Sequence, residues 1–225
     1  MMFISTVACG QVLRRPVAAA YTSLGAYSST HTDVFSITAN PASLSQLKKP
    51  AAGVYGERRF MLAELNNFMF AAGLPTGSGH FGLTGSYFGF TDFNETQAGL
   101  TYARNLGNKV DVGARFNYNG ISISSGYGTA SAVSVELGAL FHISEKLHTG
   151  IHAGNPVGGK FGKQGEEELP SVYSLGVGYD ASNKFFVSAE IVKEENQPVS
   201  VNAGMQYKFL PQLLARGGIT TGTSS

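Results

Sequence analysis

A few runs of residues have the types and spacings that nucleotide or metal chemistry needs. Gly77 to Gly82 fits G-x-G-x-x-G, but the residues after it alternate like a strand and open no helix for a pyrophosphate. Gly154 to Lys160 fits G-x-x-x-x-G-K, but Phe161 stands where a Ser or Thr would hold magnesium. His148 and His152 lie about 13 Å apart at roughly 3.3 Å per strand residue, too far to ligate one metal. We therefore predict no cofactor and, since no nucleophile pairs with a base, no enzyme.

Charged side chains give the stronger chemical signal, because they occupy the polar phase of segments in which apolar and polar residues alternate. These residues are Asp111, Arg115, Glu136, Glu190 and Arg216. A charge on a buried face needs a partner, since an unpaired one is strongly destabilising. We predict a paired charge network on an inner face, with a lining for a solute path as the alternative.

The composition indicates that water does not cover the whole surface. Only 14% of the 225 residues are charged, whereas soluble domains average about 25%. The balance of 16 Lys and Arg against 15 Asp and Glu gives no footprint for nucleic acid. No stretch reaches the ~18 consecutive apolar residues of a membrane helix, so strands would have to cross a bilayer.

From about residue 50 onward the chain alternates with the period of a strand. Most of the segments have about the nine to eleven residues that a tilted strand needs to cross a bilayer, and soluble sandwiches use shorter strands. We predict an all-β fold, an antiparallel up-and-down transmembrane β-barrel; a soluble secreted β-sandwich is the alternative. The eleven predicted strands are 51–60, 65–74, 80–90, 96–105, 109–119, 130–143, 147–153, 171–180, 184–193, 198–208 and 212–220.

The apolar phase of these strands would face lipid, and the polar phase would face the lumen. Residues predicted to face lipid include Val112, Phe116, Val135, Leu137, Val187 and Val201. Short connections should lie on the periplasmic side, at 75–79, 105–108, 144–146, 180–183 and 210–211. Longer ones should lie outside, at 91–95, 120–129, 155–170 and 194–197.

The strand count is odd, whereas bacterial single-chain barrels have even numbers. We therefore expect the C-terminal strands of the barrel to be missing, so that the part from 50 to 225 is incomplete; a miscount by one is the alternative. Residues 1–10 read as a signal-peptide remnant with a small-residue cleavage site around Cys9. Acylation of Cys9 or a buried N-terminal strand are the alternatives.

Residues 11–49 lack the strand period and are predicted to form an N-terminal periplasmic or plug segment. Within it, Asn40 can cap a short helix whose first turn takes Pro41, followed by Ala42, Ser43 and Leu44. A plain structural cap is the alternative to a functional plug motif.

These N-terminal motifs carry a resemblance to a known family. Gly25-Ala26-Tyr27, Asp33 to Ser36 and Asn40 to Leu44 resemble the entry segment of the FadL-like outer-membrane barrels, especially the PorV and PorQ group of type IX secretion. Further short matches, such as Glu57 to Phe60 and Arg216 to Gly218, extend the resemblance over nearly the whole chain. It implies the outer membrane of a Gram-negative bacterium and a barrel of roughly fourteen strands ending in an aromatic residue.

The resemblance implies two kinds of role, because some members carry hydrophobic solutes past a plug and others hand secreted cargo to the cell surface. We favour a non-enzymatic PorV/PorQ-like component of protein secretion or surface assembly. Its partners would be outer-membrane lipid and secreted cargo or other secretion components, with no nucleic acid. Polar outer loops at 120–129 and 155–170 support this role, and the inward charges disfavour an apolar pocket. A FadL-like channel for hydrophobic compounds is the alternative.

Overall fold

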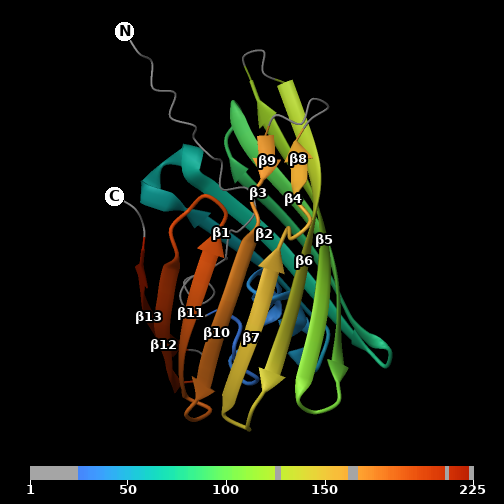
Figure 1. The fold of residues 1–225 in the computed structure, drawn as a ribbon. Helices are drawn as coiled ribbons and strands as arrows, with labels where there is room; N and C mark the ends of the chain where they lie inside the picture. The colour runs from blue at the N-terminus through green and yellow to red at the C-terminus, as the bar shows by residue number, and fades with distance from the viewer. Residues whose placement is uncertain (1–24, 125–127, 162–166, 211–212, 223–225) are drawn as a thin grey trace.

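Eleven antiparallel strands form a single curved sheet, in which each strand pairs with the next one along the chain (Figure 1). The structure, a computed structural model, describes residues 25–124, 128–161, 167–210 and 213–222. The strands are β1 (Ala51–Arg58), β2 (Asn66–Thr76), β3 (Gly79–Gly89), β4 (Phe93–Leu106), β5 (Val110–Ile123), β6 (Gly128–His142), β7 (Leu147–Gly154), β10 (Val172–Asp180), β11 (Phe185–Glu194), β12 (Ser200–Leu210) and β13 (Leu213–Thr221).

The predicted all-β, antiparallel, up-and-down architecture is confirmed, and each of the eleven strands overlaps one predicted segment. β1 and β13 are the two edges of the sheet in the described part of the chain, and they do not pair with each other. The sheet is therefore open between them. Among the residues described, no helix has the length and apolar character needed to span a bilayer.

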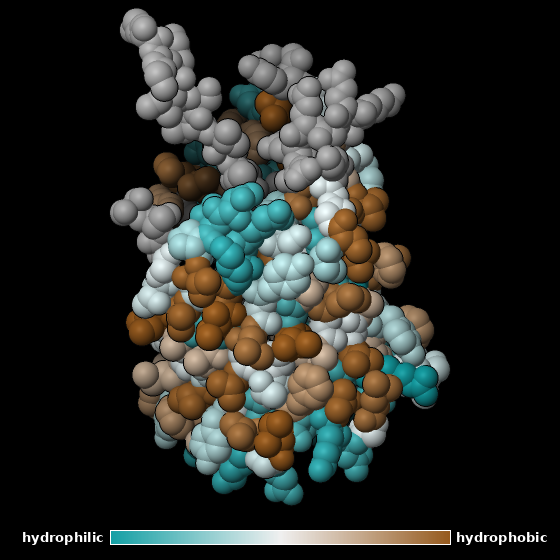
Figure 2. Space-filling view, in the orientation of Figure 1, coloured by the Kyte–Doolittle hydropathy of each residue, from teal (hydrophilic) through white to brown (hydrophobic). Residues whose placement is uncertain are grey.

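The two faces of the sheet have opposite polarity. Along β10, every second residue is buried and every other one is exposed, and the exposed positions include Tyr173, Leu175 and Val177. Figure 2 shows this outer face with a broad belt of brown and pale side chains, and teal ones gathered at the end where the short turns lie. Apolar residues thus point outward, and polar residues are enclosed.

The residues predicted to face lipid lie on the outer phase of their strands. Phe116, Leu137 and Val201 are 59%, 47% and 41% exposed, and Val112, Val135 and Val187 are partly buried. The opposite phase of the same strands holds the buried charges Asp111, Arg115, Glu136 and Glu190.

Two connections differ from the sequence prediction. The predicted loop 120–129 is mostly strand, because β5 and β6 keep their register out to the pair Ile123 and Gly128. The predicted loop 155–170 contains a small hairpin of β8 (Gly159–Phe161) and β9 (Glu167–Leu169). The hairpin forms because Phe161 and Leu169 bury their side chains against Ala132 of β6.

Residues 25–49, here called the plug, lie within the curve of the sheet (Figure 1, blue). They contain two short 3-10 helices, η1 (Val34–Thr38) and η2 (Pro41–Gln46). Asn40 caps η2 by accepting a hydrogen bond from the Ala42 backbone N–H at 2.9 Å, and Pro41 occupies the first turn. Two further 3-10 turns, η3 (Arg59–Met61) and η4 (Ala63–Leu65), connect β1 to β2. The predicted signal-peptide remnant, with Cys9, and residues 11–24 of the predicted plug segment lie outside the described residues.

Candidate functional site

Glycines on the inner face of the sheet let the plug approach the backbone of the wall. A Cβ on Gly113 would lie 2.5 Å from the carbonyl carbon of Pro41, and one on Gly138 would lie 2.0 Å from Oδ1 of Asn40. Such distances leave no room for any side chain. The inner-face glycines at which plug atoms lie closest to the position of the absent Cβ are Gly53, Gly73, Gly82, Gly113, Gly138, Gly176 and Gly178. We call this set the glycine seat.

The plug motif lies on this seat. Asn40, Pro41, Ala42 and Leu44 are all buried. Asn40 also donates from Nδ2 to the backbone carbonyl of Ile151 in β7 at 3.0 Å. The side chain that caps η2 thus also ties the plug to the wall.

Two of the predicted charges meet in the middle of the wall. The Arg115 guanidinium of β5 pairs with the Glu136 carboxylate of β6. Glu136 also accepts from Asn117 at 2.8 Å, and its other oxygen lies 3.0 Å from Nε2 of His152. Arg115 donates from Nη1 to the backbone carbonyl of Ile37 in the plug at 3.2 Å. This central ion pair is therefore buried with partners on both its groups.

Asp111 lies apart from that pair, nearer the short turns. Its Oδ2 is 2.8 Å from Nε2 of His142, whose Nδ1 is 2.8 Å from Nδ1 of His148. Nε2 of His148 is in turn 3.2 Å from Oδ2 of Asp180. The four side chains come from the four successive strands β5, β6, β7 and β10, and we call them the His–Asp row.

The remaining two predicted charges occupy separate positions. Glu190 of β11 accepts from the Tyr27 hydroxyl of the plug at 2.7 Å and from Asn202 at 3.2 Å. Arg216 of the edge strand β13 donates from Nε to Oε1 of Gln206 at 2.6 Å. The structure thus divides the five charges among four local groups. Each group contacts the plug, the last one through Gln206, whose Nε2 lies 2.8 Å from Nδ1 of His31.

Sequence reasoning missed the pairing of His142 with His148. It compared His148 with His152, which share a strand, although His152 belongs to the Arg115–Glu136 pair. The predicted turn at 144–146 could have shown the true partner, because it places 142 opposite 148 across the β6–β7 hairpin. Within the described ranges, no three His, Cys, Asp or Glu side chains are placed to hold one metal ion together.

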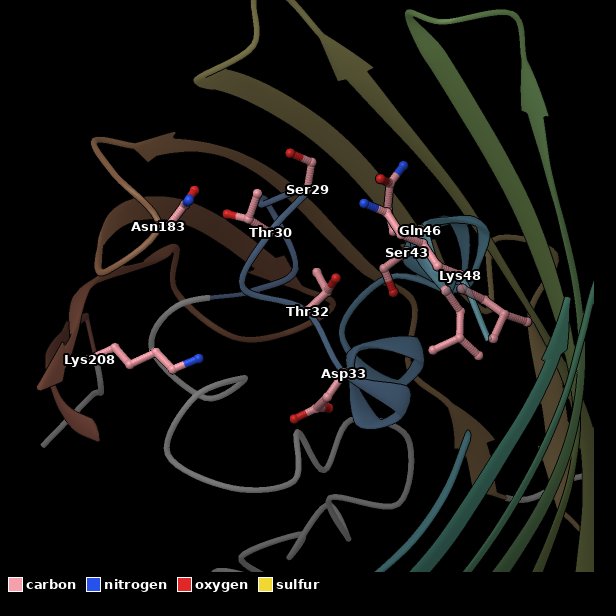
Figure 3. Close-up of a pocket in the computed structure, with 11 residues that line it drawn as sticks. Ser29, Thr30, Thr32, Asp33, Ser43, Gln46, Lys48, Asn183 and Lys208 are labelled. Atoms are coloured by element: carbon pink, nitrogen blue, oxygen red, sulfur yellow. The ribbon is translucent and has the colours of Figure 1, made fainter. Parts of the chain in front are cut away.

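Two polar cavities border the plug. One of about 460 Å³ lies between the plug and the β11–β12 side, where Lys208 and Asp33 extend into the space from opposite sides (Figure 3). The other, of about 770 Å³, lies at the short turns and is lined by Gln46, Asn105 and three members of the His–Asp row. Both suit water or polar groups better than a hydrocarbon.

A third cavity, of about 560 Å³, has the opposite character. It is a hollow in the outer face of the sheet over β6, β7, β10 and β11, where small residues lie between larger apolar ones. Its lining residues are Leu137, Gly138, Ala139, Ile151, His152, Ala153, Tyr173, Ser174, Leu175, Ile191 and Lys193. We call this cavity the wall hollow. The sequence did not predict an apolar cavity at this position.

An apolar cluster packs the β8–β9 hairpin against the outer ends of β5 and β6. Phe161 and Leu169 of the β8–β9 hairpin contact Ala132, with Ile121 and Ala130 packed alongside. Asn155 anchors the hairpin by donating from Nδ2 to the Leu169 carbonyl at 2.7 Å.

Comparisons with known proteins identify the fold. No family model and no curated protein matches this chain. Among solved structures, the Pseudomonas putida toluene transporter TodX superposes with a TM-score of 0.63 at 13% identity, over 94% of this chain and 85% of that one. The KdgM porin superposes with a TM-score of 0.50 at 10% identity, over 76% of this chain and 89% of that one.

The chain has the fold of a membrane β-barrel. At such low identities the likeness concerns the fold alone. The two neighbours are a transporter and a porin, neither of them an enzyme.

Proposed function

We propose that the chain is an outer-membrane barrel of a Gram-negative bacterium that lets small hydrophobic compounds pass, without catalysing a reaction. This places the FadL-like channel ahead of the secretion role that the sequence favours. The wall hollow is the observation that carries the proposal, and the toluene transporter TodX as a fold neighbour adds support.

The hollow has the properties of a site for a small apolar molecule. Its volume falls within the roughly 300–1,000 Å³ of typical ligand pockets, which are mostly apolar with a few polar groups. The hollow lies over the small side chains of Ala139 and Ala153. The larger side chains of Leu137, Ile151 and Leu175 surround it. The two cavities described beside the plug are lined mainly by polar and charged side chains, and the plug packs closely against the glycine seat.

Filling the hollow tests the proposal. The double variant Ala139→Phe/Ala153→Phe should lower the uptake of labelled toluene by cells that express the barrel, because two phenyl rings would occupy the space. Ala98→Phe is the matched control, since Ala98 is exposed on the outer face of β4, away from the hollow. Equal uptake by both variants and the parent, at equal membrane levels, would refute the hollow as part of the route.

A PorV/PorQ-like role in secretion or surface assembly is the second candidate. The observation in its favour is the pairing of β8 with β9, which gives the described parts of the longest outer connection a defined structure. Its support is smaller than the sequence suggests, because 120–129 is mostly strand and the hairpin is anchored inward. Deleting 160–168 should impair capture of secreted cargo and spare uptake if this role is correct, and the opposite result favours the channel.

A further inference from the structure

The His–Asp row requires a particular number of protons. Ionised carboxylates only accept hydrogen bonds, so the contacts of Asp111 and Asp180 each need an N–H on the facing Nε2 atom. The central contact between the two Nδ1 atoms of His142 and His148 needs one proton between them. The intact row therefore holds three protons on four ring nitrogens, which makes one imidazole neutral and the other positively charged.

Either a lost or a gained proton breaks this arrangement. With two protons, one contact sets a nitrogen lone pair against another acceptor. With four, two N–H groups meet head-on at an Nδ1–Nδ1 separation of 2.8 Å, and two positive rings lie side by side. At this separation the two charges repel each other, and His148 is buried at 2% exposure.

The plug closes over both ends of the row. Gln46 donates from Nε2 to Oδ2 of Asp111. At the other end, the Ser28 hydroxyl donates to Oδ1 of Asp180 at 2.7 Å, and the Ser29 backbone N–H donates to Oδ2 at 3.2 Å. Gln46 Nε2 also lies 3.2 Å from Nε2 of His142, and Ser29 Oγ lies 3.4 Å from Nε2 of His148. Because the plug contacts both rings, its docking and the proton count of the row are linked.

We propose that the His–Asp row is a proton-dependent latch that holds the plug most firmly when the two histidines share one proton. The proposal does not depend on which compound crosses the barrel. It assigns a role to the paired histidines, which the passage of a hydrophobic solute does not use.

The sign of the pH dependence follows from counting protons. With the plug released, the two imidazoles no longer have to share one proton. In acid the released row carries an extra proton on both rings against one when docked, so acid favours release. In alkali the released row carries none against one, so alkali favours release as well. Docking should thus be strongest at an intermediate pH and should weaken on both sides, by up to about tenfold per pH unit.

The groups that face the row do not produce such a maximum themselves. Gln46, Ser28 and Ser29 of the plug do not titrate, and neither does Asn105, which donates to Oδ1 of Asp111 at 2.7 Å. Lys109 and Glu145 line the cavity beside the row at the short turns. A single lysine or carboxylate changes the strength of docking in one direction only as the pH rises, so neither produces a maximum.

Hydrogen exchange of the full chain in lipid vesicles tests the latch. Protection of residues 28–47, corrected for the intrinsic exchange rate at each pH, should pass through a maximum between pH 5 and pH 8.5, the range that brackets the charge change of histidine side chains. In His142→Gln/His148→Gln the protection should be lower and independent of pH. Should the double variant fail to insert, either single variant should lack the maximum.

His80→Gln provides the matched control, because Nε2 of His80 lies 3.1 Å from the Leu47 carbonyl of the plug but has no place in the row. This variant should keep the maximum. The proposal is overturned by a flat or monotonic profile in the parent protein, by a maximum that persists without His142 and His148, or by its loss in His80→Gln.

Discussion

The inner and outer faces of this sheet are built from the same strands, yet they suit different environments. The outer face exposes apolar side chains, and the inner face buries polar and charged ones. On β5 and β6 the outward residues include Phe116 and Leu137, whereas the inward ones include Arg115 and Glu136, each 3% exposed. In a soluble sandwich the burial of these two sets would be reversed. A polar inner face therefore does not imply an open pore, because the plug packs against this face and contacts its paired charges.

Removing one charge from the inner face should have the largest effect on stability. Glu136→Ala leaves the buried Arg115 without its carboxylate, and losing one partner of a buried ion pair costs about 3–5 kcal/mol. Urea unfolding in lipid vesicles measures the change in the free energy of unfolding. Glu145→Ala, in an exposed turn, is the control, and a loss no larger than in the control would contradict the inner-face assignment.

Placing a charge on the outer face should have the next largest effect. Val135→Arg should destabilise the inserted barrel by about 2–4 kcal/mol, because Val135 lies at the middle of β6 (Gly128–His142) and so near the bilayer midplane. Val201→Arg should cost less, because Val201 lies at the outer end of β12 and the penalty falls to about 0–1 kcal/mol near the interface. Similar small effects of both substitutions, in a chain that fractionates without membrane, would instead indicate the soluble sandwich.

The smallest effect on stability is expected when one glycine on each face is replaced by alanine. Gly113→Ala should cost about 1–3 kcal/mol and lower the exchange protection of the plug, because its Cβ would overlap the backbone of Pro41. Gly85→Ala should be nearly neutral, since nothing lies within 4 Å of a Cβ there. Equal stability of the two variants would mean that the glycine seat does not constrain the plug.

The sequence predicted the two faces well because alternation is a local signal. β10 keeps strict alternation over all of its residues, and the boundaries of β5 and β6 were misplaced only where Ser, Thr and Gly obscure the pattern between 120 and 130. The β8–β9 hairpin escaped prediction because its strands are too short to show a period, and its position depends on contact with Ala132.

The candidate site was predicted less completely, because it depends on contacts between distant segments. The phase of Arg115 and Glu136 indicated that both face inward, and their direct pairing follows from the β5–β6 register. The contacts of Glu190 with Tyr27 and of Asp180 with Ser28 could not be deduced, since no local pattern specifies where the plug lies. The sequence shows that glycines occur on the polar phase of the strands. Only the position of the plug explains why a side chain would not fit there.

The place of the plug in the chain has a consequence for the order of folding. Tyr27 is hydrogen-bonded to a residue 163 positions later, and Ser28 to one 152 positions later. Such long sequence separations slow folding, because a large loop must close before the contact can form. The segment that is synthesised before the strands can dock only after β10 and β11 have joined the sheet. We therefore expect the growing barrel to pass through a state with an empty glycine seat, and insertion of the plug to be the last and slowest step of assembly.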